Sequence, residues 1–124
     1  MISYLSVFDV PFDESEKVYH AFVLGLLVGL KDKYDVKSNR ESGFGRYDVM
    51  LCPKKPSDLG IIMEFKKAEP GGKANLEAVA QSAIKQIEEK QYAVELLERG
   101  VKRILYLGFA FSGKHVVIKH RFKD

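Results

Sequence analysis

The chain has 124 residues, of which 46% are hydrophobic and 30% are charged, a balance typical of one soluble globular domain. Its net charge of +3 permits a polyanionic partner without requiring one. Cys52 is the only cysteine in the sequence, which excludes an internal disulfide and cysteine-based metal clusters. A single thiol suits a reducing compartment, so we expect a cytoplasmic protein.

The N-terminal region predicts a loop followed by a buried helix. Acids stand where a signal peptide has its basic region, so no export signal is expected. Asp13 or Ser15 is a suitable N-cap, and an apolar run follows over Val18–Leu30. That run is shorter than the ~20 apolar residues of a membrane-spanning helix, which predicts no membrane insertion. Because it is apolar nearly all round, the helix should pack on a sheet.

Three strands are predicted next. Tyr34–Glu41 and Arg46–Cys52 form a hairpin around a glycine turn at Ser42–Gly45. Pro53–Leu59 contains two prolines and several polar residues, which is typical of an exposed loop. This loop leads into a third strand, Gly60–Lys67.

A second helix is expected over Ala74–Arg99, which is rich in strong helix formers. Its apolar stripe is predicted to comprise Leu76, Ala80, Ala83, Ile87, Val94 and Leu97. Lys90 and Gln91 interrupt the stripe, which indicates a kink or a break into two helices near Tyr92.

Two further strands, Val101–Ser112 and His115–Phe122, follow this helix. The predicted order is therefore helix, three strands, helix and two strands. Without repeats or an internal linker, residues 1–124 are expected to form a single α/β domain.

The third strand, GIIMEFKK, places charged side chains in an apolar run. Glu64 and Lys66 share a face with Ile62, because side chains alternate along a strand. Such residues are rarely buried unless they are paired. A Glu64–Lys66 ion pair is the simple interpretation, although a buried pair adds little net stability after desolvation.

Asp48, in the preceding strand, provides a second acid. If Cys52 lies opposite Gly60 in an antiparallel pair, Asp48 lies opposite Glu64. Two opposed carboxylates repel each other unless a positive charge lies between them. Two carboxylates and retained waters are a common way to hold Mg²⁺. Lys66, beside such an ion, could stabilise developing negative charge or help to position and deprotonate an attacking water.

Five ordered blocks resemble the PD-(D/E)XK nuclease-like domain that is often found C-terminal to an AAA-ATPase-like domain in bacterial and archaeal proteins. They are YHAFVLGLL, NRESGFGRYD, IIMEFK, AIKQIEEKQY and LGFAFSGK, and they extend from about Tyr19 to Lys114. The resemblance implies a restriction-endonuclease-like αβββαβ core with a mixed central sheet flanked by helices. It also implies a Mg²⁺-dependent nuclease, with Mn²⁺ able to substitute, that acts on DNA ahead of RNA.

Residue by residue, the resemblance implies that Asp48 and Glu64 bind the metal ion together with the Phe65 carbonyl. Lys66 matches the catalytic lysine, and Gln86 matches a glutamine that such families often carry on the following helix. Tyr47 stands where the proline of the motif's name would be, a departure that leaves the metal ligands intact.

Several alternatives stay open at this point. Glu41 is either a further acid near the site or the ion-pair partner of Arg46 across the turn. His20 either faces the site or is a hydrogen-bonded core residue. The cations of the last strand either contact nucleic acid or protect a sheet edge.

The function also has alternatives. The chain could be a catalytically silent module that binds nucleic acid or protein, or a structural dimerisation domain, for which a large exposed apolar patch would be the sign. A homodimer and an AAA-ATPase-like partner domain are among the expected partners.

Overall fold

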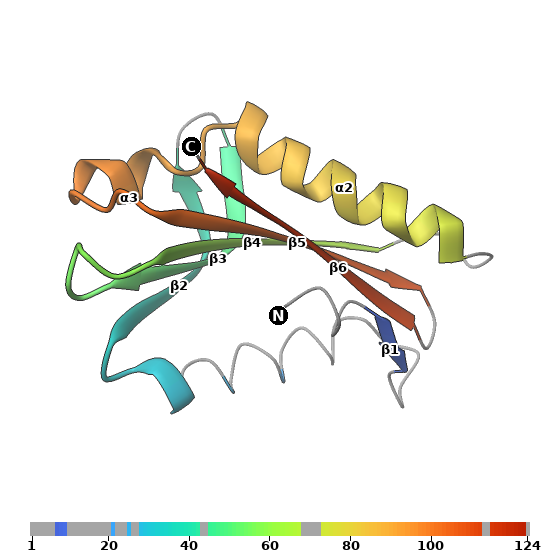
Figure 1. Ribbon diagram of the computed structural model, residues 1–124, viewed down its shortest axis with the longest axis horizontal. Helices are drawn as coiled ribbons and strands as arrows, with labels where there is room; N and C mark the ends of the chain where they lie inside the picture. The colour runs from blue at the N-terminus through green and yellow to red at the C-terminus, as the bar shows by residue number, and fades with distance from the viewer. Residues whose placement is uncertain are drawn as a thin grey trace.

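A six-stranded mixed sheet lies at the centre of the computed structural model, which describes residues 7–9, 21, 25, 28–42, 45–67, 73–112 and 115–123 (Figure 1). Its strands, in spatial order, are β1 (Val7–Asp9), β6 (His115–Lys123), β5 (Ile104–Ser112), β4 (Gly60–Lys67), β3 (Gly45–Pro53) and β2 (Tyr34–Ser42). β4 and β5 pair in parallel, and every other neighbouring pair is antiparallel. The parallel pair requires a crossover, which the helical segment between β4 and β5 provides.

The crossover consists of two helices, α2 (Lys73–Glu89) and α3 (Val94–Glu98), so the predicted break near Tyr92 is confirmed. Gln91 has a φ of 55°, a left-handed conformation that ends α2 and redirects the chain. The redirection also changes the buried stripe. Leu96 is fully buried, whereas Leu97, which we predicted to be in the stripe, is 46% exposed, so that part of the prediction was wrong.

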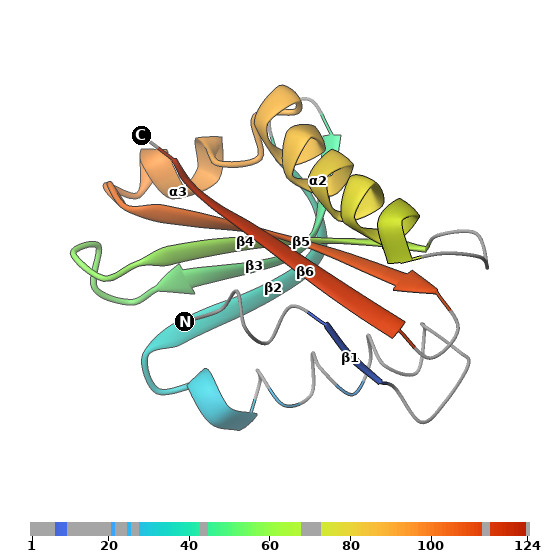
Figure 2. The ribbon, with the colours of Figure 1, turned by 45° about the vertical axis from the view of Figure 1, so that its right-hand side comes forward.

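The two faces of the sheet are packed differently. α2 and α3 cover one face, and helical residues 28–30 lie on the other (Figure 2). On the α2 side, Met50, Ile62 and Tyr106 pack against the helices, and on the opposite side Leu30 packs against a cluster that includes Val49. The predicted first helix, Val18–Leu30, lies largely outside the described residues. Within this range, residues 21, 25 and 28–30 are described, and they are helical.

The strand predictions agree with the structure with two exceptions. The strand predicted over Val101–Ser112 begins at Ile104, because Val101 is still tied to the end of α3: its backbone N donates a hydrogen bond to the Leu96 carbonyl at 3.1 Å. β1 was not predicted, because three residues at a sheet edge carry too short a pattern to stand out from a loop. It pairs with residues 115–117 of β6.

Gly108 lets α2 approach β5 closely. A Cβ atom at this position would lie 2.3 Å from the Ala80 carbonyl oxygen and 3.0 Å from Ile84 Cγ1. Gly108→Ala is therefore expected to destabilise the protein by about 3 kcal/mol, the upper end of the usual overpacking cost, because the obstructing atom is backbone. Chemical denaturation measures this difference in the free energy of unfolding.

The matched control is Gly25→Ala, a helical glycine where an added Cβ meets no atom within 4 Å. That substitution should leave the stability unchanged or raise it by up to about 1 kcal/mol, because alanine is the better helix former. Equal effects of the two substitutions would contradict the close packing of α2 on β5.

Candidate active site

The pairing of β3 with β4 brings two acids to one position on the α2 face of the sheet. Met50 lies opposite Ile62 and Val49 opposite Met63, which confirms the register assumed from the sequence. Continued by one step, this register would place Asp48 opposite Glu64. The paired stretch ends at Val49 and Met63. Beyond it, the backbone N–H of Phe65 donates a hydrogen bond to Asp48 Oδ2 at 2.7 Å.

This hydrogen bond anchors the Asp48 carboxylate to β4. The ring of Phe65 points to the opposite face of the sheet, where it stacks on Phe109 with ring centroids 4.5 Å apart. Phe65 is thereby held on both faces of the sheet: its ring packs on Phe109, and its backbone N–H binds the Asp48 carboxylate.

Gln86 of α2 joins the two charged residues of β4. Its amide nitrogen donates to Glu64 Oε2 at 2.9 Å, and its amide oxygen accepts a hydrogen bond from Lys66 Nζ. Glu64 and Lys66 thus point to the same face, as alternation along the strand predicts, but they are bridged by an amide. No direct ion pair joins Glu64 and Lys66 among the contacts of the described residues, so this simple interpretation was wrong.

Tyr92 completes this hydrogen-bond network and was missed as a site residue by sequence reasoning. Its hydroxyl oxygen accepts a second hydrogen bond from Gln86 Nε2, at 3.1 Å, and the residue is only 1% exposed. Tyr92 reaches this position because the chain turns between α2 and α3. The available signal was an aromatic residue with a polar end placed at a helix break, which is weaker than a charge in an apolar strand.

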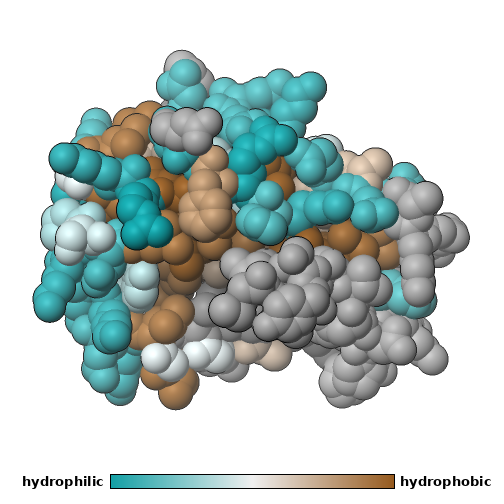
Figure 3. Space-filling model, in the orientation of Figure 1, coloured by the Kyte–Doolittle hydropathy of each residue, from teal (hydrophilic) through white to brown (hydrophobic). Residues whose placement is uncertain are grey.

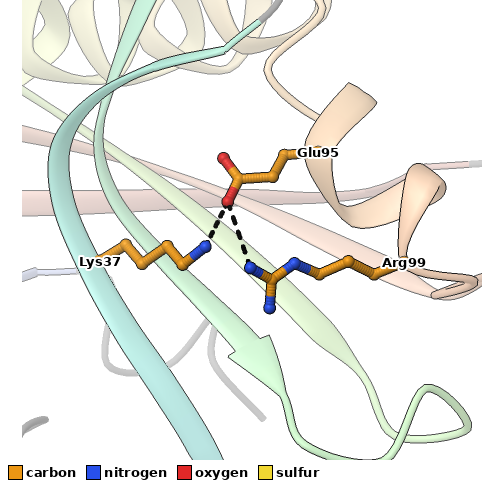
Figure 4. A network of polar contacts seen from close by, with 3 residues as sticks. All are labelled: Lys37, Glu95 and Arg99. Atoms are coloured by element: carbon orange, nitrogen blue, oxygen red, sulfur yellow. Dashed lines mark hydrogen bonds and ion pairs between the residues drawn. The ribbon is translucent and has the colours of Figure 1, made fainter.

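α3 is tied to the far edge of the sheet by an ion pair. Lys37 of β2 donates to Glu95 Oε2 at 2.5 Å, and Arg99 lies 3.9 Å from the same oxygen (Figure 4). Because Tyr92 lies two residues before the start of α3, this contact helps to fix the segment that carries the tyrosine. The network is half-buried, so it contributes more than a fully exposed pair would.

Glu64 lies in an environment that disfavours its negative charge. Burial, reinforced by the nearby charge of Asp48 and opposed by Lys66, raises the pKa of Glu64 to about 8. Glu64 is 6% exposed, and among the described residues its Oε1 has no hydrogen-bond partner. Burial also raises the pKa of Asp48, although the Phe65 N–H and Lys66 oppose the shift.

These observations fit a divalent cation between the two acids. A buried carboxylate oxygen without a partner is costly unless something positive binds it, and oxygen atoms are the ligands that Mg²⁺ prefers. The described residues contain no group of three or more His, Cys, Asp or Glu side chains that could hold a metal ion. Two carboxylates would therefore be the acidic ligands available here, a number with which Mg²⁺ is commonly held together with several waters.

The metal-free protein should lose stability as the pH rises from about 4.5 to about 8. The folded state keeps Glu64 protonated up to a pKa of about 8, whereas the unfolded chain releases this proton near its ordinary value of 4.5. Between these values the folded state binds more protons, so its free energy of unfolding falls with pH. Urea unfolding in EDTA across this range measures the slope of the free energy of unfolding against pH. A contribution of Glu64 to this free energy that rises with pH would contradict its burial.

The other predicted candidates have separate outcomes. Glu41 is the Cα partner of Arg46 in the β2–β3 hairpin, but both side chains lie outside the described part, as does His20. Two cations of β6 pair with acids of α2: Lys119 lies 3.1 Å from Glu77 and Arg121 lies 2.8 Å from Glu88. These contacts were not predicted.

Comparison with known proteins addresses the family. A model of the PD-(D/E)XK nuclease superfamily matches residues 14–121, which include every site residue described above. A search of curated proteins finds no significant match. Among the described helices, none is both long and apolar enough to span a membrane. The mixed sheet flanked by helices is the restriction-endonuclease-like core that the sequence predicted. The chain therefore belongs to the PD-(D/E)XK nuclease superfamily.

Proposed function

We propose that this protein is a divalent-metal-dependent nuclease that hydrolyses phosphodiester bonds in nucleic acid, with DNA preferred to RNA. The single observation that carries the proposal is the buried Glu64, which lies close to the charges of Asp48 and Lys66 and whose Oε1 has no hydrogen-bond partner among the described residues. A stability role does not explain this arrangement, because burying the carboxylate costs free energy. Membership in a nuclease superfamily supports the same reading.

Mg²⁺ would be held by Asp48, Glu64 and the Phe65 carbonyl, with Mn²⁺ able to substitute. When bound, such an ion polarises a phosphodiester and lowers the pKa of a coordinated water. The anchoring of Asp48 by the Phe65 N–H keeps one ligand in place before the ion arrives. Binding also requires Glu64 to lose its proton, so affinity for the metal should be tighter above its pKa of about 8 than below it.

Lys66 is proposed to act on the phosphate. Its Nζ donates to the Gln86 amide oxygen, which fixes the ammonium group near the two acids and leaves two further N–H groups. From there it can donate to a phosphate oxygen and stabilise the negative charge that develops during hydrolysis. The alternative role is to position the attacking water and accept its proton.

Gln86 and Tyr92 are positioning residues in this proposal. Tyr92→Phe removes the hydroxyl that holds Gln86 and should lower kcat about fivefold to tenfold, the equivalent of one ordinary hydrogen bond. KM and the affinity for Mg²⁺ should be unchanged. Steady-state kinetics on nucleic acid, with Mg²⁺ titrated by calorimetry, separates these quantities.

Tyr106→Phe is the matched control, because it removes the other tyrosine hydroxyl of the same buried cluster. It should leave kcat close to that of the unmodified protein. A Tyr92→Phe protein with lower thermal stability but full kcat per folded molecule would reduce Tyr92 to a structural residue.

Cleavage assays test the proposal itself. The purified protein is incubated with supercoiled plasmid, single-stranded DNA and RNA in Mg²⁺, Mn²⁺ or EDTA. We expect metal-dependent cleavage that Asp48→Ala abolishes and that Asp35→Ala, an exposed acid on β2, preserves. Cleavage that persists in Asp48→Ala would remove this site from the mechanism.

The silent module is the alternative, and a metal titration distinguishes it. A protein that only binds nucleic acid has no need to retain a Mg²⁺ site, whereas the proposed enzyme does. The preference for DNA, the cytoplasmic location, a homodimer and an ATPase-like partner domain stay predictions.

A further inference from the structure

Three turns meet at the end of the sheet where β4 and β5 begin. They are residues 31–33 before β2, residues 54–59 between β3 and β4, and residues 98–103, which run from the last residue of α3 to the start of β5. Figure 1 shows all three on its left side, where α3, the β3–β4 loop and the start of β2 come together. The candidate active site lies further along β4, at Glu64 and Lys66.

Backbone hydrogen bonds hold these turns in fixed positions. Lys54 N donates to the Lys33 carbonyl at 2.9 Å, and Gly60 N donates to the Arg103 carbonyl at 2.8 Å. Gly100, with a φ of 87°, lets the third turn pass beside Pro56. The surface is therefore already organised before any partner binds, which lowers the entropic cost of binding.

This end of the molecule is strongly basic. Seven cations project from the three turns: Lys31, Lys33, Lys54, Lys55, Arg99, Lys102 and Arg103. All of them are exposed, and the same segments carry only three acids, Asp32, Asp58 and Glu98. The resulting net positive charge exceeds that of the whole chain, +3. Figure 3 shows hydrophilic side chains along this margin.

The charge is not neutralised by neighbouring acids in the described part of the protein. Of the seven cations, Arg99 alone lies within ion-pair distance of a described acid, Glu95 at 3.9 Å. By contrast, Lys119 and Arg121 of β6 are matched by acids of α2. Clustered like charges repel one another and destabilise the fold, so the cluster is better explained by an external anion.

A hollow between two of the turns can receive part of that anion. It has a volume of about 420 Å³ and is lined by Pro56, Ser57, Gly100, Lys102 and Arg103. Two cations and a hydroxyl around one hollow are suitable partners for a phosphate group. We propose that this basic surface, defined as residues 31–33, 54–59 and 98–103, binds the phosphate backbone of the nucleic acid that the active site cleaves.

Nucleic acid fits this surface better than a protein partner does, because the surface lacks apolar anchors. The exposed large apolar side chains of the described part are Val28, Leu97 and Phe122, all outside these segments. Protein interfaces usually contain buried aromatic or aliphatic anchors, whereas nucleic-acid interfaces are more polar and more positive. The inference rests on the proposed function and adds a second contact region to it.

The spacing defines how much nucleic acid the two regions span. Gly60 lies at the basic end, and Glu64 and Lys66 lie four and six residues further along β4, or ~13–20 Å. With a rise of 3.4 Å per base pair, this distance corresponds to roughly four to six base pairs. Shorter duplexes cannot reach both regions.

Binding of labelled duplex DNA of roughly 20 base pairs, measured by fluorescence anisotropy in EDTA, tests the surface without cleavage. Lys54→Gln/Lys102→Gln should weaken binding about tenfold at about 100 mM salt and reduce the slope of log K against log salt by roughly two, one for each lost phosphate contact. The matched control is Lys85→Gln/Lys119→Gln, which removes the same charge from α2 and β6 and should change binding less than about twofold. Equal losses in the two double variants would overturn the proposal.

Two further arms separate the inference from the proposed function and from a protein partner. With Mg²⁺, the Lys54→Gln/Lys102→Gln protein should cleave the long duplex with a lower kcat/KM than the unmodified protein. Both proteins should cleave a hairpin with a stem of about three base pairs equally well, because this substrate is too short to reach the basic surface. Specific loss of binding in a protein that never cleaves would support the surface and contradict the nuclease. Cleavage with no effect of the double variant would contradict the surface alone. If the protein binds poly-glutamate as tightly as DNA, and the Lys54→Gln/Lys102→Gln substitutions weaken both equally, the surface would be assigned to an acidic protein.

Discussion

Lys66→Ala should lower the rate of phosphodiester cleavage by roughly 10²–10⁴, with the fold preserved. The ammonium group is fixed by its hydrogen bond to Gln86 on the same face as Asp48 and Glu64. Its removal takes away a positive charge beside Glu64, but it leaves both acids in place. Single-turnover cleavage with saturating Mg²⁺ measures the loss in the chemical step, and circular dichroism checks the fold.

Lys67→Ala is the control for this substitution. Lys67 is the next residue of β4, it is exposed, and its side chain points to the opposite face. Its loss should change the cleavage rate less than about threefold, since an exposed charge is screened by salt. If both lysine variants lose activity equally, the general charge of the strand matters and the specific position of Lys66 does not.

Glu64→Gln should have opposite effects on stability and on metal binding. At pH 9, above the Glu64 pKa of about 8, the metal-free wild-type protein carries a buried charge that the amide lacks. The variant should therefore be more stable than the wild type in EDTA at this pH, with the difference shrinking at pH 6, where Glu64 is neutral. Gln86 can still donate to the oxygen at position 64, which preserves the hydrogen bond.

Addition of Mg²⁺ should reverse the order. At a concentration 100 times its Kd, the ion stabilises the wild type by about 2.7 kcal/mol, and the variant should gain much less. Thermal unfolding with and without Mg²⁺ at pH 9 gives both comparisons. A Glu64→Gln protein that is less stable in EDTA, or that keeps the full gain from Mg²⁺, would contradict the role of Glu64 as a ligand.

The sequence predicted most of the sheet because its strands carry clear local patterns. GIIMEFKK alternates between two largely buried faces, and the loop at Pro53–Leu59 fixed the pairing of β3 with β4 well enough to predict Met50 opposite Ile62, the register that brings Asp48 close to Glu64. Charges in an apolar strand are costly, so their presence was an informative signal. β1 was not predicted, because a strand of three residues gains its stability from pairing with β6 and carries little sequence pattern of its own.

The contacts made by α2 and α3 were harder to predict. Gln86 was identified through the family resemblance, whereas its bond to Tyr92 depends on how the chain turns at Gln91. The same turn exposes Leu97 and buries Leu96, against the predicted helical stripe. The apolar period of a helix keeps its register only as far as the helix is continuous. Beyond the break, the direction of every side chain depends on tertiary packing.

A crystal structure of the protein soaked with Mn²⁺, with the ion located by anomalous scattering, tests the central claim most directly. We predict one ion bound between the carboxylates of Asp48 and Glu64, at oxygen distances of about 2.0–2.3 Å, within reach of the Phe65 carbonyl. Glu64 Oε1, which has no hydrogen-bond partner among the described residues, should be one of its ligands. Mn²⁺ found only elsewhere in a protein that still cleaves nucleic acid would contradict the account.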